Sequence, residues 1–465
     1  MTTRTTEPTL SAAPKATPMP EAAQHPEPGI RANGNASLAL YGGEPTLTRP
    51  VRERWKPIRL PDIYRIVRYA MRGVSTVTAG DCIGELERAF AQCTASQYAI
   101  AMNSGTATLH SAYYAAGVKP GHEVIVPSYT FYASAAPILQ LGGTPVFCDI
   151  DPRTLTADPD DVEKRITPNT RAICVVHVWG NPARMDRFVA IARKHNLTLI
   201  EDCSHAHGAT FQGKPVGSWG DIGCFSMQGA KPVSGGELGV AVTDDPKLHD
   251  HMLALGHFGR VASGQQAATY DIDALSLGFK YRPHPYGVLL ALGSLARLDQ
   301  LNQRRRQNYA ILTQELRHCP ALRPIDIYPG ARRGGLLEFI FRFHPEHANG
   351  ISAGLFVKAA AAEGVPIQRD RYTLLGRRGR LLHELPLFNE LDYTQHGGFM
   401  AGGPNRYRDD PTRRATLPHA EALADQLVSL PPFTDVDERD VRAVGRALRK
   451  VADALPKITD HRRGV

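Results

Sequence analysis

Short apolar runs alternate with helical patterns between residues 85 and 245. The apolar runs predict buried strands at 98–103, 123–126, 145–150, 171–178, 197–201, 222–227 and 238–242. Helical periodicity predicts intervening helices at 106–116, 131–141 and 185–195. This alternation is typical of βαβ units, so we expect an α/β domain with a mainly parallel sheet.

The pattern changes after a long helical stretch at 286–316. A strand at 336–343, a helix at 353–363 and terminal helices near Ala420 and Val441 then predict a second, smaller α/β domain. We therefore divide the chain into a tail at 1–36, a large domain at 37–318 and a small domain at 319–465. The polar stretch at 369–415 is long for a loop of a compact domain, so we expect it to be functional or ordered by a partner.

Composition narrows the class of protein. The 465 residues are 42% hydrophobic and 22% charged, which excludes a collagen, a disulfide scaffold and bulk disorder. No run approaches the ~20 apolar residues that a membrane-spanning helix requires. Residues 1–36 are rich in Thr, Pro, Ala and Glu and lack the apolar core of a secretory signal, so we expect a disordered tail. The seven cysteines form no CxxC pair, which favours a reducing, cytoplasmic location.

The formal charge of +8 raises the question of an anionic partner. Its excess is dispersed over short clusters, at 304–306, 332–333 and 369–380, with few aromatic residues between them. A nucleic-acid groove interleaves basic and aromatic side chains, and solvated basic faces are common. We therefore expect no nucleic-acid partner.

A first candidate site follows the strand at 98–103. The segment Asn-Ser-Gly-Thr-Ala at 103–107 ends that strand and opens the next helix. Free backbone N–H groups and the helix dipole at such a junction favour a phosphate, and Gly105 allows close approach of the backbone. The alternative is an ordinary helix cap, for which Ser-Gly-Thr is also suitable.

A second candidate site is the acidic end of the strand at 197–201. Asp202 stands where a carboxylate can pair with a protonated ring nitrogen and keep the pKa of that nitrogen high, as an electron-sink cofactor requires. The alternatives are a helix cap and a metal ligand. His205 and His207 lie nearby, but no third ligand set with recognisable spacing accompanies them, so we expect no metal.

A third candidate is Lys231, which lies between an apolar strand and the glycine-rich turn at 229–236. Burial and nearby positive charge would lower the pKa of such an amine toward nucleophilic use. A lone lysine is usually a surface residue. Taken in order, however, the three sites offer an anion site, a pyridinium partner and an imine-forming amine, which together suit pyridoxal 5'-phosphate.

The motifs resemble those of a known family. They are NSGTATLH, VIVPSYTFYASA, GGTPVFCDIDPRTLTADP, VHVWGNPARMD, IEDCSHAHGA and CFSMQGAKPVSGGELG. In this order, from about Leu38 to Ala454, the chain resembles the DegT/DnrJ/EryC1/StrS pyridoxal-phosphate aminotransferases of fold type I. LALYGGEP at 38–45 is similar to the branch with glutamine-dependent keto-cyclitol aminotransferases and aminohydroxybenzoate synthase. The resemblance implies a mainly parallel seven-stranded sheet between helices, plus a smaller C-terminal α/β domain.

The resemblance also implies roles for single residues. Lys231 matches the lysine that binds the cofactor covalently and later shuttles a proton, and Asp202 matches the acid on the pyridine nitrogen. Phe131 matches the aromatic residue that stacks on the ring, or else is a core phenylalanine. His205 matches a position near the ring oxygen. The implied phosphate contacts are Ser104, Gly105, Thr106 and Ser226.

One segment departs from the family pattern. Many members carry a Gly-x-Asn-x-Arg segment whose Asn reaches the phosphate of the neighbouring subunit, whereas this chain has Lys280 in that place. Lys280 would serve the phosphate as a point charge, face a substrate acid, or face solvent. The arginine-rich loop at 369–414 is also unusual, and we expect it to cover the active site or to contact an anionic acceptor.

The implied activity is transfer of an amino group from L-glutamine or L-glutamate to the ketone of a cyclitol or sugar, in a homodimer with active sites at its interface. The resemblance leaves two alternatives, a sugar dehydratase of the same fold and a non-catalytic relative. Lys231 argues against a dehydratase, because the deoxygenating members carry His there. A nicotinamide-dependent dehydrogenase would also show the alternation of strands and helices, but no GxGxxG follows the first strand.

Overall fold

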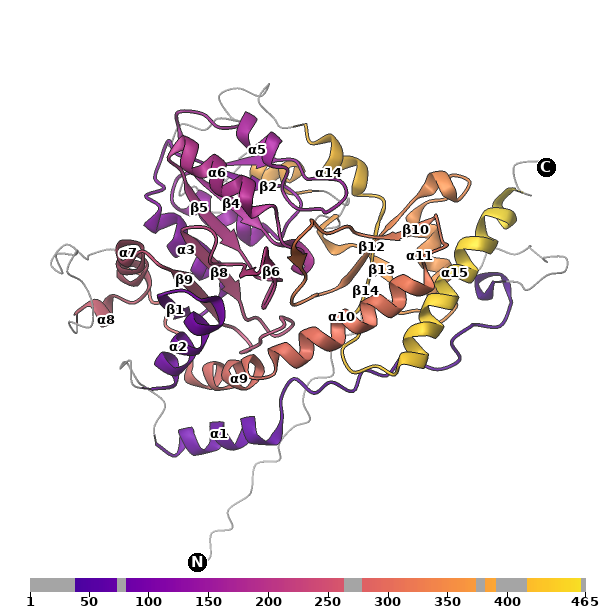
Figure 1. Ribbon diagram of the computed structural model, residues 1–465, viewed down its shortest axis with the longest axis horizontal. Helices are drawn as coiled ribbons and strands as arrows, with labels where there is room; N and C mark the ends of the chain where they lie inside the picture. The colour runs from indigo at the N-terminus through magenta and orange to yellow at the C-terminus, as the bar shows by residue number, and fades with distance from the viewer. Residues whose placement is uncertain (1–37, 73–80, 263–277, 374–380, 390–415, 461–465) are drawn as a thin grey trace, which may run out of the picture.

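The computed structural model describes residues 38–72, 81–262, 278–373, 381–389 and 416–460. The predicted tail at 1–36 and most of the predicted loop at 369–415 lie outside these ranges. A large and a small α/β body lie side by side, and helix α10 (Leu298–Glu315) runs from one to the other (Figure 1).

The large body is built on a seven-stranded sheet of order β1-β9-β8-β5-β4-β2-β3. In that order the strands are Tyr98–Met102, Gly239–Thr243, Ile222–Ser226, Thr198–Asp202, Thr170–Val176, Glu123–Pro127 and Thr144–Cys148. Strand β9 pairs antiparallel with both neighbours, and the other pairings are parallel. The predicted sheet is confirmed, with strand ends shifted by one or two residues.

Helices cover both faces of this sheet because its strands bury side chains on both sides. Along β2, Val124 and Val126 join one core with Leu109 of α3, whereas Ile125 between them joins another with Phe188 of α6. The helices around the sheet are α2 (Cys82–Thr94), α3 (Gly105–Ala115), α4 (Ala136–Gln140), α5 (Pro159–Lys164), α6 (Met185–His195), α7 (Pro246–Gly256) and α9 (Pro285–Leu295). The sheet is thus fully enclosed, as a parallel sheet requires.

The small body is an antiparallel sheet covered by helices. Its strand order is β10-β12-β14-β13, with the bounds Leu322–Pro324, Phe339–Phe343, Leu427–Leu430 and Gln368–Arg369. Helices α11 (Ala353–Ala362) and α15 (Glu438–Asp460) pack on it together with α10 (Figure 1). The predicted smaller α/β unit is therefore present. Among the described residues, none of the helices is long and apolar enough to cross a membrane.

Three predicted elements are interrupted. The helix expected at 131–141 is a 3-10 turn, η2 (Tyr132–Ser134), followed by α4, because Ala135 has a φ of −112°. The helix expected at 286–316 divides into α9 and α10 at Arg297, whose ψ of 4° is not helical. The strand expected from residue 336 begins at Phe339, since Leu336 has a left-handed φ of 43°.

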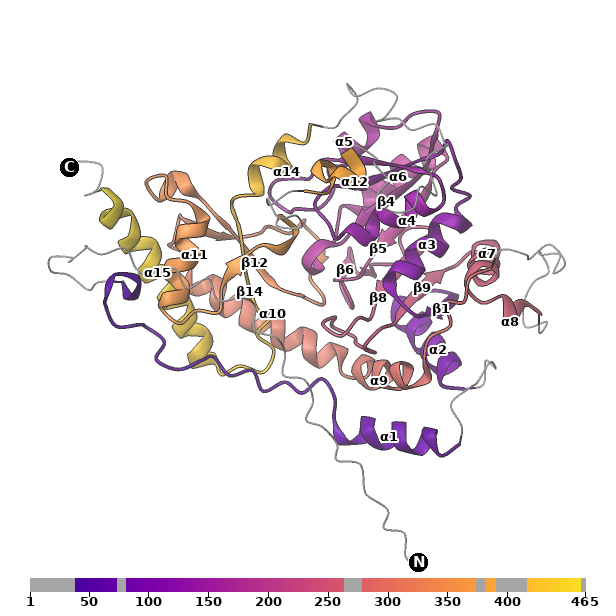
Figure 2. The same cartoon turned by 180° about the vertical axis from the view of Figure 1, so that it is seen from behind.

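Residues between β13 and β14 leave the small sheet and pack on the large body. They include η7 (Leu382–Glu384), α12 (Pro386–Asn389) and α14 (Pro418–Leu423) (Figure 2). The Phe388 ring lies 5.3 Å from that of Phe147, and the Ala420 N–H donates to Asp149 Oδ1 over 2.8 Å. This excursion covers the carboxyl ends of β2 and β3.

Candidate active site

A cavity of about 380 Å³ lies where the carboxyl ends of β5 and β8 meet the N-terminus of α3. A 3-10 turn, η6 (Arg371–Thr373), contributes to it from the C-terminal part of the chain. Its volume suits a cofactor-sized ligand. The predicted site residues that line it are Ser104, Gly105, Thr106, Phe131, Asp202, His205, Ser226 and Lys231.

The N-terminus of α3 forms an anion cradle on one side of the cavity. Ser104 caps the helix, its Oγ accepting the N–H of Ala107 over 3.1 Å. A Cβ on Gly105 would lie 2.5 Å from Cβ of Ser226, so glycine is needed for β8 to approach the helix this closely. The hydroxyl-bearing end of β8 and the first turn of α3 therefore face one pocket, an arrangement that favours a phosphate.

Asp202, at the end of β5, is held by hydrogen bonds on both carboxylate oxygens. Its side chain is buried, Oδ2 accepts from Ser134 Oγ over 2.7 Å and Oδ1 accepts from the N–H of Ser204 over 3.1 Å. Thr130 Oγ1 lies 3.0 Å from Ser134 Oγ and extends the network. A carboxylate oriented in this way can pair with a protonated ring nitrogen in the cavity.

Lys231 lies in a folded loop between β8 and β9. The loop is closed by bonds from Met227 N–H to the carbonyl of Leu238 (2.8 Å) and from Gly235 N–H to the carbonyl of Met227 (2.9 Å). Burial lowers the pKa of Lys231 to about 8, with the positive charge of Arg371 acting in the same direction and Asp202 opposing it. The amine is therefore neutral, and nucleophilic, at a lower pH than a surface lysine.

His205 forms a stack of three rings with Trp179 and Tyr372. Trp179 has a left-handed φ of 55°, and its N–H donates to His205 Nδ1 over 3.2 Å. Nε2 of His205 must then carry the hydrogen and donate to Tyr372 Oη, 2.8 Å away. The ring centroids of Trp179 and Tyr372 are 4.6 Å apart. Burial holds the pKa of His205 well below its usual value, so the imidazole is neutral.

Aromatic side chains stand at the mouth of the cavity. Phe131 is 41% exposed and its ring lies 4.5 Å from that of Tyr132 and 6.3 Å from that of Tyr372. Phe131 is thus not part of the buried core. An accessible ring in this position can stack on a planar ligand.

Lys280 does not reach the cavity of its own chain. It is exposed, and its backbone forms an isolated bridge with His257. The next residue, Tyr281, directs its hydroxyl to His110 Nδ1 over 2.6 Å. The structure thus brings together every predicted site residue except Lys280.

Several residues of the site were not singled out from the sequence. They include Ser134, Arg371 and Tyr372, which line the cavity, and Trp179, which stacks on His205. Ser134 and Trp179 lie inside motifs that carried the family resemblance, but nothing in the sequence marks the hydrogen bonds that they make. Arg371 and Tyr372 lie in the arginine-rich segment, whose single positions could not be placed without the fold.

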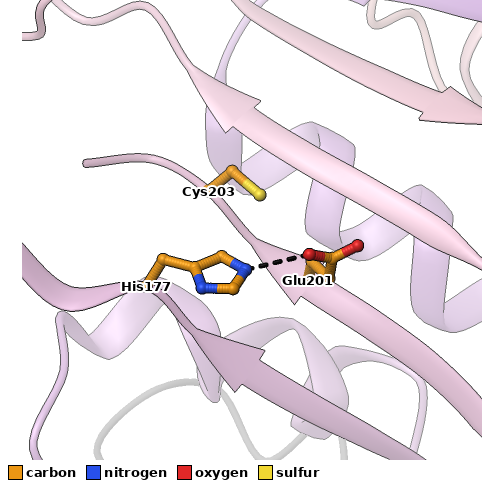
Figure 3. Close-up of side chains that lie close together, drawn as sticks. All are labelled: His177, Glu201 and Cys203. Carbon is orange, nitrogen blue, oxygen red and sulfur yellow. Dashed lines mark hydrogen bonds and ion pairs between the residues drawn. The ribbon is translucent and has the colours of Figure 1, made fainter. Parts of the chain in front are cut away.

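A separate buried cluster, His177, Glu201 and Cys203, has the residue types of a metal site (Figure 3). His177 uses both ring nitrogens, Nδ1 for the N–H of Ala183 and Nε2 for Glu201. Glu201 also accepts the N–H groups of Gly217, Trp219 and Gly220, at 2.9, 2.7 and 2.7 Å. These bonds occupy the ligand atoms of His177 and Glu201, and they fasten the 217–220 turn to β5.

The fold and the cavity define the class of protein: an α/β enzyme of fold type I, as expected from the sequence. Residues 62–375 match the family model described as the DegT/DnrJ/EryC1/StrS aminotransferase family, and the chain belongs to this family. The predicted membership and fold class are confirmed. The family implies pyridoxal phosphate as cofactor.

Curated relatives and solved structures agree with this assignment. The L-glutamine:2-deoxy-scyllo-inosose aminotransferase of Streptomyces paromomycinus is 32% identical over 429 residues, covering 89% of this chain and 97% of the relative. The enzyme of that name from Streptomyces kanamyceticus is 32% identical over 440 residues, covering 92% and 98%. The structure of DesI with its TDP-sugar product has a TM-score of 0.72 at 29% identity, covering 92% and 99%. 3-Amino-5-hydroxybenzoic acid synthase also has a TM-score of 0.72, at 26% identity, covering 87% and 100%.

Proposed function

We propose that the protein is a pyridoxal-phosphate-dependent aminotransferase that moves an amino group from L-glutamine or L-glutamate to the ketone of a cyclitol or sugar, in specialised metabolism. The observation that carries the proposal is the common cavity of Lys231, Asp202 and the N-terminus of α3. The names of relatives that match about nine tenths of the chain support the donor and acceptor classes.

The residues of the cavity suit the cofactor. The phosphate would lie at the first turn of α3 against Ser226, with Gly105 permitting its approach. Asp202 would hold the ring nitrogen, Phe131 would stack on the ring and Lys231 would bind the aldehyde carbon. When bound, pyridoxal 5'-phosphate supplies an electron sink for the bonds of the donor α-carbon.

Residues of the chain would then transfer the protons and keep the carboxylate of Asp202 oriented. Lys231 Nζ, once released by the donor amine, would take the proton from the donor α-carbon and return protons in the second half of the reaction. The bonds from Ser134 and Ser204 would keep the carboxylate of Asp202 aimed into the cavity. His205 and Tyr372 would wall one side of the cavity, with Trp179 stacked against both rings.

We further propose a cytoplasmic homodimer. Helix α1 (Leu60–Ala70) contacts its own chain through Asp62, which pairs with Arg297 over 3.1 Å. On the opposite side of the helix lies an exposed apolar stripe, Leu60 (82% exposed), Tyr64 (67%), Val67 (56%) and Met71 (85%). A second copy of the chain would cover this stripe and bring its Lys280 to the phosphate.

Absorbance spectroscopy tests the activity directly. Purified protein given pyridoxal 5'-phosphate should gain a near-visible band that Lys231→Ala abolishes. Added glutamine should bleach that band, and a 2-deoxy-scyllo-inosose type of ketone should restore it. The absence of any band after incubation with the cofactor would refute the proposal.

A further inference from the structure

Asp370 lies at the junction between the small sheet and the wall of the cavity. It follows strand β13, and its backbone N–H donates to the carbonyl of Leu427 in β14 over 3.1 Å. The residue is fully buried. Its Oδ2 accepts the N–H groups of Tyr372 (3.1 Å) and Thr373 (3.2 Å), the second and third residues of η6. Asp370 therefore caps the turn that brings Tyr372 to the cavity.

The same carboxylate is joined to the large body through Tyr129. This tyrosine is buried, and its hydroxyl accepts the indole N–H of Trp179 over 2.8 Å. An indole N–H can only donate, so the hydrogen of the tyrosine hydroxyl is left for another acceptor. That acceptor is Asp370, to which the side chain of Tyr129 is hydrogen-bonded. Since Tyr129 lies between β2 and Phe131, the bond links the wall to a segment that lines the cavity.

These contacts close a circuit of hydrogen bonds around the ring stack. Trp179 donates its backbone N–H to His205, and His205 donates to the hydroxyl of Tyr372. The indole N–H of Trp179 leads through Tyr129 to Asp370. The carboxylate of Asp370 then accepts the N–H of Tyr372. Because the two branches end on the hydroxyl and on the backbone of Tyr372, this residue is held at both ends.

We propose that Asp370 is a positioning residue for the cavity: its carboxylate holds Tyr372 against His205 and so fixes the wall that the C-terminal part of the chain contributes. Asp370 lies behind the residues that line the cavity and acts through Tyr372. The circuit requires the ionised carboxylate, because a protonated carboxyl group presents a hydrogen of its own toward donors. The inference rests on the proposed function for its rate measurement, whereas the apoprotein suffices to test the circuit.

The ionisation of Asp370 gives the circuit a pH dependence. Burial raises the pKa of this carboxyl to about 7, although the hydrogen bond from Tyr129 and the charge of Arg369 lower it. Burial raises the pKa of both Tyr129 and Tyr372, so neither tyrosine loses its proton near neutral pH. His205 stays neutral there, because burial lowers its pKa. The wall is therefore fixed above about pH 7 and loosens as the pH falls through this value.

Tryptophan fluorescence of the apoprotein tests the circuit without the cofactor. Trp179 donates to both branches, so its emission should change as Asp370 titrates, with a midpoint near pH 7. Trp179→Phe should remove this change and so assign it. Asp370→Asn keeps an oxygen for the N–H groups of η6 but has no charge to lose, and it should remove the change as well.

Tyr129→Phe provides a shift that a purely structural role would not produce. The carboxylate of Asp370 loses a donor that favours its ionised form. The midpoint of the fluorescence change should therefore move up by about one pH unit, the value of a hydrogen bond to a charged group. This variant also carries the test if Asp370→Asn does not fold.

The rate of amine transfer tests the consequence for the site. With saturating cofactor and glutamine, we expect bleaching by Asp370→Asn at pH 8 to be about 10- to 100-fold slower than by the unchanged protein. The fall in rate toward acid pH should be absent from this variant. In Tyr129→Phe that fall should begin at a higher pH, in the same direction as the fluorescence midpoint.

Asp245→Asn is the matched control. Asp245 caps α7 in the same way, its Oδ1 accepting the N–H groups of Lys247 (2.7 Å) and Leu248 (3.4 Å), at a site outside the cavity. Neither the fluorescence midpoint nor the pH dependence of bleaching should change in this variant.

A fluorescence titration that Asp370→Asn leaves unchanged would overturn the inference, and so would an unchanged midpoint in Tyr129→Phe. Equal effects of Asp245→Asn and Asp370→Asn on the rate would overturn it too, since any helix cap would then serve. These results would leave the proposed function standing, provided that glutamine bleaches the unchanged protein. Failure of that bleaching would instead refute the proposed function, and the apoprotein titration would still decide whether the circuit exists.

Discussion

At the scale of single residues, the site depends on polar groups that their neighbours hold in place. Asp202 receives hydrogen bonds from Ser134 and Ser204 and lies in the same cavity as Lys231. Asp202→Asn keeps the shape of this group and removes its charge. We expect kcat with saturating cofactor to fall about 10- to 100-fold or more, the value of a charged hydrogen bond.

The control for this substitution is Asp425→Asn, which alters an exposed carboxylate outside the cavity and should leave kcat unchanged. A variant Asp202→Asn with full kcat would show that no ring nitrogen depends on this carboxylate.

The pKa of Lys231, lowered to about 8 by burial, predicts how the apoprotein takes up its cofactor. The neutral amine is the reactive form, so the rate of uptake should rise about tenfold per pH unit below this value and level off above it. An unperturbed lysine would continue this rise to about pH 10.4. Stopped-flow absorbance between pH 6.5 and 10 distinguishes the two, and a rise without a plateau would contradict the burial of the amine.

At the scale of elements, the sequence pattern was sufficient to predict the strands that are buried along their whole length. The seven strands of the large sheet are buried on both faces, so their apolar runs are long and unambiguous. The breaks at Ala135, Arg297 and Leu336 are matters of backbone geometry. Tertiary packing imposes such geometry, and the periodicity of the sequence continues across it.

The hydrogen bonds that Glu201 accepts predict that this side chain stabilises strand β5 and the turn at 217–220. Its side chain accepts hydrogen bonds from His177 and from the turn at 217–220, all within the core. Glu201→Gln places an NH₂ group opposite backbone N–H donors. Each buried N–H that is left without an acceptor lowers the free energy of unfolding by about 1–3 kcal/mol. Denaturant unfolding of the apoprotein should show this loss, whereas Glu438→Gln, at an exposed site, should stay within about 0.5 kcal/mol.

Zinc added to the unchanged apoprotein or to Glu201→Gln should leave the midpoint of denaturant unfolding unchanged. A zinc-dependent rise that Glu201→Gln abolishes would mean that the cluster of His177, Glu201 and Cys203 binds metal after all.

At the scale of the whole molecule, the sequence predicted the cavity as a meeting of three motifs and suggested the loop at 369–414 as its cover, but it did not indicate which residues of that loop line the cavity. The motifs follow β1, β5 and β8, whose order in the sheet the α/β class constrains. Arg371 and Tyr372 come from a segment more than 100 residues further along the chain. Its approach to the large body depends on side-chain packing that no local pattern encodes.

The exposed apolar stripe of α1 predicts that this helix lies in the interface of a dimer. Leu60→Glu together with Val67→Glu should shift a dimer toward monomer in sedimentation velocity, because each would place a charge in an apolar contact. Arg72→Glu, which changes an exposed residue off the stripe, should leave the sedimentation coefficient unchanged. If the doubly substituted protein still sediments as a single dimer species, α1 does not lie in the interface.

The excursion between β13 and β14 makes the two bodies interdependent. Leu382, Phe388 and Leu423 complete the core of the large body, although they follow most of the small one along the chain. A protein shortened before residue 381 would therefore lose part of the larger core as well. We expect heating to melt both bodies in a single cooperative calorimetric transition, and we expect no truncation near residue 318 to yield an autonomous N-terminal fragment.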